Sequence, residues 1–98
     1  MPFPEQEQHP FTESGIDCLT SPQPGIYGIF NSDCCIYIGQ ADDLKTKLLR
    51  HLRGQSPQSA RILQNKPTYY LQMTVAVGLL DTRQAQLITD YNPVAQYG

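Results

Sequence analysis

Residues 25–30 read Gly-Ile-Tyr-Gly-Ile-Phe, and residues 35–39 read Cys-Ile-Tyr-Ile-Gly. Both runs are rich in β-branched and aromatic side chains, which favour strands. The polar stretch Asn31-Ser32-Asp33 lies between them, and such a short polar break predicts a β-hairpin. The rest of the chain is expected to pack around this hairpin.

The segment after the hairpin has the pattern of two helices. Asp42 or Asp43 is a suitable cap for a helix over residues 44–53, and Gly54 is a suitable stop. Leucines at four-residue spacing give this helix one apolar stripe, at Leu44, Leu48 and Leu52. Ser56-Pro57 is typical of a second helix start, and residues 65–67 (Asn-Lys-Pro) end that helix.

A third strand and a last helix complete the expected fold. Residues 68–77 alternate, so that one face carries Leu71, Met73, Val75 and Val77 and the other carries Tyr70, Gln72, Thr74 and Ala76. Asp81 is a suitable N-cap for a helix over residues 82–91, which Asn92-Pro93 terminates. The order β-β-α-α-β-α predicts an α+β fold with a small three-stranded antiparallel sheet flanked by helices.

The first 18 residues have no apolar periodicity and include three of the eight prolines. They are expected to form an extended or disordered arm, pinned at Phe11, before a single domain over residues 19–98. No apolar run is long enough to span a bilayer, and the N-terminus does not resemble a secretory signal. The three cysteines, two of them adjacent, do not form a disulfide or zinc pattern. A reducing, cytoplasmic location is therefore expected.

Charge is unevenly distributed although the net charge is only −2. Residues 1–43 carry acids and no Lys or Arg, whereas residues 44–66 carry no acid and six basic residues, Lys45, Lys47, Arg50, Arg53, Arg61 and Lys66. This basic block predicts either a surface that meets a phosphate backbone or a solvated helix face. Charge alone slightly favours the solvated helix face.

The hairpin triplets, with their spacing, resemble those of the GIY-YIG nuclease superfamily: Gly25-Ile26-Tyr27, nine residues, then Tyr37-Ile38-Gly39. Residues 37–44 (Tyr-Ile-Gly-Gln-Ala-Asp-Asp-Leu) resemble the family's passage from strand to helix. Leu87-Ile88, Tyr91 and Pro93 resemble its closing helix. The resemblance covers about residues 19–96 and is nearest in pattern to the nuclease domain of the bacterial excision-repair incision enzyme.

The resemblance implies hydrolysis of a phosphodiester with one divalent metal ion, and it implies a role for four positions. The first motif tyrosine, which deprotonates or orients the attacking water in the family, is Tyr27, and the second, which supports that network, is Tyr37. The family arginine that binds the phosphate falls on Lys47, and the family glutamate that holds the metal falls on Gln84. The family's closing asparagine falls on Gln96.

Two of these positions depart from the family in their chemistry. Lys47 keeps a positive charge but lacks the planar fork of arginine. Gln84 lacks the negative charge that a hard cation prefers, and the chain has no glutamate after Glu13. Arg50, one turn beyond Lys47, is a possible substitute for the arginine, and Asp81 is a weak substitute for the carboxylate. For Asp81, a role as the N-cap of the last helix is the simpler expectation.

The sequence therefore predicts a GIY-YIG-like domain that binds nucleic acid weakly and with salt sensitivity, with cleavage impaired or lost. The expected nucleic-acid-binding residues are Lys45, Arg50, His51 and Arg53, although a half-exposed helix histidine is the plainer interpretation of His51. No tightly bound cofactor is expected, with Mg²⁺ or Mn²⁺ required if the site is active. Two alternatives stay open: an active metal-dependent DNA endonuclease that uses Lys47 or Arg50, and a protein-interaction module with a protein partner. No membrane association is expected.

Overall fold

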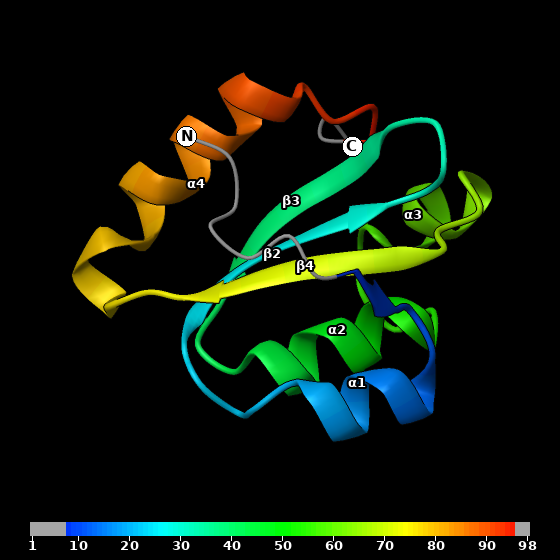
Figure 1. Cartoon of the computed structure of the whole chain (residues 1–98), viewed down its shortest axis with the longest axis horizontal. Coiled ribbons are helices and arrows are strands. Elements are labelled where there is room, and N and C mark those ends of the chain that lie inside the picture. The colour runs from blue at the N-terminus through cyan, green and yellow to red at the C-terminus, as the bar shows by residue number, and fades with distance from the viewer. Residues whose placement is uncertain (1–7, 96–98) are drawn as a thin grey trace.

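A four-stranded antiparallel sheet lies between two layers of helices in this computed structural model, which describes residues 8–95 (Figure 1). The strands are β1 (His9–Pro10), β2 (Gly25–Phe30), β3 (Cys35–Ala41) and β4 (Tyr69–Thr74), in the spatial order β1-β4-β2-β3. The expected α+β class and antiparallel sheet are confirmed. The sheet has four strands instead of three, because residues 9–10 add a short strand beside β4.

The helices divide between the two faces of the sheet. Helices α1 (Glu13–Leu19) and α2 (Leu44–Leu52) lie on one face, and α4 (Leu80–Tyr91) lies on the other, as Figure 1 shows. The short α3 (Ser59–Gln64) leads from α2 back to β4. Asp43 caps α2 by accepting a hydrogen bond from the Thr46 N–H, which confirms the expected start of this helix.

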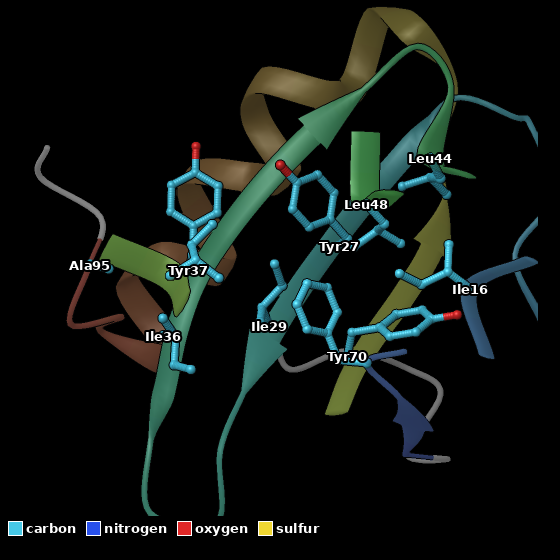
Figure 2. Packing of buried hydrophobic residues seen from close by; sticks show 11 residues of the cluster. Ile16, Tyr27, Ile29, Ile36, Tyr37, Leu44, Leu48, Tyr70 and Ala95 are labelled. Carbon is cyan, nitrogen blue, oxygen red and sulfur yellow. The ribbon is translucent and has the colours of Figure 1, made fainter. Parts of the chain in front are cut away.

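Two hydrophobic clusters fill the spaces on either side of the sheet. The cluster under α1 and α2 contains Tyr27, Tyr37, Tyr70, Ile16, Leu44 and Leu48, most of which Figure 2 shows. The cluster under α4 contains Ile26, Phe30, Ile38, Leu71, Leu80 and Leu87. The alternation in β4 is confirmed for Leu71, Met73 and Val75, which belong to the α4 side, and for Tyr70, which belongs to the other side.

The expectation of an extended or disordered arm over residues 1–18 is wrong for the part that the structure describes. Thr12 caps α1 by accepting from the Gly15 N–H, and Ile16 is fully buried beneath the sheet. The short apolar set of Phe11 and Ile16 is too sparse to give a visible period, yet both side chains are buried. Residues 1–7 and 96–98, including Gln96, lie outside the described residues.

The end of β4 and the start of α4 also differ from expectation. The strand ends at Thr74, and a 3-10 turn, η1 (Val77–Leu79), runs directly into α4, leaving Val77 exposed. Asp81 is therefore not the N-cap, because the helix already begins at Leu80, which is buried against the sheet. The Asp81 carboxylate is free of the capping role and bonds to another side chain described below. No helix in residues 8–95 is long and apolar enough to cross a membrane.

Candidate functional site

The two motif tyrosines lie on the same face of the sheet, on neighbouring strands. Their ring centroids are 6.2 Å apart, and both hydroxyl groups point toward the same end of the sheet (Figure 2). Tyr27 is directly opposite Gly39 in the β2–β3 ladder. A Cβ atom at Gly39 would lie 2.2 Å from the Tyr27 hydroxyl oxygen and 2.8 Å from a Tyr37 ring carbon. Gly39 thus leaves the space that lets both tyrosines occupy this layer.

This close approach predicts that Gly39→Ala strongly lowers the free energy of unfolding. The added methyl group has to displace Tyr27, and such overpacking typically costs about 1–3 kcal/mol. We expect urea unfolding to show a loss of that size, whereas Gly78→Ala, where nothing lies within 4 Å, should change stability much less. An equal effect of the two substitutions would contradict the packing described here.

His51 contacts the Tyr27 hydroxyl from α2. Its Nε2 lies 2.5 Å from the Tyr27 oxygen, and its Nδ1 lies 2.5 Å from the Ser56 hydroxyl oxygen. The side chain is fully buried, so the expectation of a half-exposed histidine is wrong, and in this position it does not reach a phosphate backbone. Burial, together with the charges of Lys47 and Arg50, lowers the pKa of His51 to about 4. His51 is therefore neutral near pH 7.

The sequence did contain a signal for this burial. His51 follows Leu44 by seven residues and Leu48 by three, so it belongs to the apolar stripe of α2. Burial also raises the pKa of Tyr27 well above its ordinary value, with a further contribution from the neighbouring Tyr37. Both partners of the hydrogen bond are thus held in their neutral forms.

Lys47 and Arg50 line an open groove of about 350 Å³ at the start of α2. The other lining residues are Gln40, Ala41, Asp42, Asp43 and Thr46. Lys47 is half-buried and Arg50 is exposed, with one guanidinium N–H donating to the Gln55 carbonyl at 3.4 Å. The groove therefore brings two cations together with the polar end of β3.

Lys45 in α2 and Arg53, the C-cap residue that follows α2, are paired with α1. Lys45 lies 3.4 Å from the Asp17 carboxylate, and Arg53 forms an ion pair with Glu13. The acids of the N-terminal segment thus face part of the basic block. Sequence reasoning placed these acids in an extended or disordered arm and did not anticipate the pairing.

Gln84 is locked into a network of side-chain amides at the edge of the sheet. Its Nε2 donates to the Ile38 carbonyl at 3.2 Å, and its Oε1 accepts from Gln40 Nε2 at 2.8 Å. The same Gln40 nitrogen donates to the Asp81 carboxylate at 2.6 Å. Both ends of the Gln84 amide are therefore used within the protein. Gln40 was quoted in the motif but was not anticipated as part of the site.

The side chains of Gln84, Gln40 and Asp81 do not fit a Mg²⁺ site. A hard cation needs anionic oxygens, and the two oxygens that converge here already share the NH₂ group of Gln40. Within residues 8–95, no group of three or more His, Cys, Asp or Glu side chains is placed to hold a metal ion. The position that the resemblance assigns to a metal ligand is thus occupied by a neutral amide, which shares the Gln40 NH₂ group with the Asp81 carboxylate.

The four sequence-derived site residues form two half-sites. Tyr27 and Tyr37 lie with His51 in the layer between the sheet and α2, whereas Gln84 reaches the main chain of β3 from α4. Gln40 connects them, because it lines the groove of Lys47 and also bonds to Gln84. Gln84 is therefore linked to the groove of Lys47 through Gln40.

The fold and the paired tyrosines define a GIY-YIG domain. Solved structures agree: the GIY-YIG N-terminal endonuclease domain of UvrC from Thermotoga maritima, bound to magnesium as its catalytic divalent cation, superimposes with a TM-score of 0.69 at 28% identity. The match covers 81% of this chain and 89% of that domain. A tyrosine-to-phenylalanine variant of the same domain gives the same TM-score at 27% identity over 82% of this chain. The chain therefore belongs to the GIY-YIG nuclease superfamily.

Sequence comparison identifies the same relatives. The UvrABC system protein C of Pseudomonas protegens is 34% identical over 91 residues, which are 86% of this chain, and that of Aliivibrio salmonicida is 30% identical over 89 residues, or 90%. The chain spans only 14% of the length of either protein. No protein-family model matches it.

Proposed function

We propose that this GIY-YIG domain binds the phosphate backbone of a nucleic acid along α2 and cleaves it weakly or not at all. The observation that carries the proposal is the Gln84 amide held between the Ile38 carbonyl and Gln40. It stands where the family has a glutamate, and it offers a cation no negative charge at that position. Lys47 supplies charge to the phosphate without the bidentate geometry of arginine.

Nucleic-acid binding is assigned to Lys47 and Arg50, because Lys45 and Arg53 are already neutralised by Asp17 and Glu13. A free cation at a phosphate releases condensed counterions, whereas a cation held by a carboxylate must first break an ion pair. The likeness to a UvrC endonuclease domain supports a nucleic acid as the ligand.

We expect Lys47→Gln with Arg50→Gln to weaken binding to a short duplex and to reduce the salt slope by about two. The matched pair Lys45→Gln with Arg53→Gln removes the same charge and should weaken binding much less. Fluorescence anisotropy at several salt concentrations measures both. Equal losses would show that only overall charge matters, and absence of binding at low salt would refute the proposal.

An active endonuclease is the second candidate, and the Asp81 carboxylate favours it. Asp81 does not cap α4 and lies within hydrogen-bond reach of the same Gln40 nitrogen as Gln84. A movement of Gln40 would free one carboxylate oxygen beside the edge of the sheet. The cleavage assay described in the Discussion separates the two candidates.

A further inference from the structure

A continuous line of hydrogen bonds leads from the buried Tyr27 hydroxyl to the start of α3. It passes through His51 to Ser56 and continues to Ser59, whose hydroxyl oxygen lies 2.6 Å from that of Ser56. The Ser59 hydroxyl in turn donates to the Arg50 carbonyl at 3.3 Å. His51 and Ser59 are buried. The family resemblance assigns no role to either serine.

The direction of these bonds follows from counting hydrogens. A carbonyl oxygen only accepts, so the single hydroxyl hydrogen of Ser59 points to Arg50. Ser59 then accepts from Ser56, and it also accepts the backbone N–H of Ser56 at 3.0 Å. Because Ser56 has used its own hydrogen, it can only accept from His51.

The same logic fixes the ring of His51. A neutral imidazole carries one N–H and one lone pair, so a donating Nδ1 leaves Nε2 as the acceptor. The hydroxyl hydrogen of Tyr27 must then point inward to Nε2. The Tyr27 oxygen can then only accept hydrogen bonds from groups other than His51.

We propose that Ser56 and Ser59 are positioning residues, which hold His51 in its Nδ1–H tautomer and turn the Tyr27 hydroxyl hydrogen toward Nε2 of His51. In this orientation the Tyr27 hydroxyl donates to His51 and not to a phosphate oxygen. Only this last consequence rests on the proposed function. The tautomer itself is a property of the free protein.

The buried and neutral state of the pair supports this arrangement. The lowered pKa of His51 and the raised pKa of Tyr27 both oppose transfer of the proton from the phenol to the ring. The hydrogen therefore stays on Tyr27 while its direction is set by the serines. The hydrogen-bonded group of Tyr27, His51 and the two serines is therefore complete. At the other half-site, Gln84 stands where the family has a glutamate.

Long-range ¹H–¹⁵N correlation spectra of the ¹⁵N-labelled protein, recorded near pH 7 without nucleic acid, test the proposal. We expect a pyrrole-type Nδ1 and a pyridine-type Nε2 for His51. Ser59→Ala should shift the tautomer toward Nε2–H, because the freed Ser56 hydroxyl can then donate to Nδ1. Ser59 does not touch the ring, so a merely structural role predicts no such shift. Ser32→Ala, in the exposed hairpin loop, is the matched control and should leave the spectrum unchanged.

A pyrrole-type Nε2 in the unmodified protein would overturn the proposal without any substitution. So would a folded Ser59→Ala protein, checked by circular dichroism, whose His51 keeps its Nδ1–H tautomer. If Ser59→Ala does not fold, the spectrum of the unmodified chain still decides. Because no ligand is present, failure of this test is distinct from failure of nucleic-acid binding.

Discussion

The unmodified chain should leave supercoiled plasmid DNA uncut in Mg²⁺ or Mn²⁺, and the double substitution Gln84→Glu with Lys47→Arg should restore part of the nicking activity. A carboxylate at position 84 would supply the anionic oxygen that a hard cation prefers. An arginine at position 47 would supply a fixed guanidinium fork for the phosphate. Loss of one such stabilising group typically costs on the order of 10²–10³ in rate, so the two defects together should bring cleavage to background.

Two tyrosine variants make this experiment specific to the site. Tyr27→Phe in the restored protein should abolish nicking, because it removes the phenol oxygen that is hydrogen-bonded to His51. Tyr69→Phe is the matched control, since Tyr69 stacks on Phe30 on the α4 side of the sheet. Strong Mg²⁺-dependent cutting by the unmodified chain, lost in Tyr27→Phe, would establish the active-endonuclease alternative. Asp81→Asn would then identify the carboxylate in use.

Stability should fall steeply between about pH 6.5 and pH 4 because of His51. Its pKa is lowered to about 4 in the folded protein, whereas an unfolded histidine has a pKa of about 6.5. As the pH falls through this window, His51 binds a proton in the unfolded chain but remains unprotonated in the folded protein. The stabilisation is thus fully present above pH 6.5, and a loss on the order of 3 kcal/mol is expected by pH 4.

Urea unfolding at several pH values measures this loss. His51→Gln retains a polar side chain of similar length but cannot titrate, so its stability should change less across the same window. All other side chains are the same in both proteins, so the difference between the two profiles isolates His51. The titratable and charged groups that face the ring are Tyr27, Tyr37, Lys47 and Arg50. Parallel profiles would show that His51 is not held neutral.

Local patterns were sufficient for the elements that they control. The β2–β3 hairpin, the Asp43 cap and the two-sided strand β4 follow from short-range chemistry, and all are found in the structure. The N-terminal segment was missed because β1 and α1 are stabilised by contacts made across the sequence, such as the Thr20–Tyr70 hydroxyl contact at 2.6 Å. No short window of sequence contains that information.

The sequence motif names four candidate positions but not the contacts that these residues make. The motif located Tyr27, Tyr37, Lys47 and Gln84, but it did not reveal that Gln40 bonds to both Gln84 and Asp81. Asp81 was misassigned because a cap depends on where the helix starts, and burial of Leu80 moves that start back by two residues. His51 was misjudged because a charged neighbourhood in sequence outweighed its position on the apolar stripe.

The two outer strands of the sheet have one more consequence, for the way this domain meets other proteins. On one side the described strand β1 is two residues long and pairs only with Tyr69 and Tyr70, so residues 71–74 of β4 extend beyond it. On the other side, the carbonyls of Cys35, Ile36 and Ile38 in β3 accept from Val94, Ala95 and the Gln84 side chain. A strand added beside β3 would find these carbonyls occupied, so β-sheet augmentation at that edge is a poor route to association.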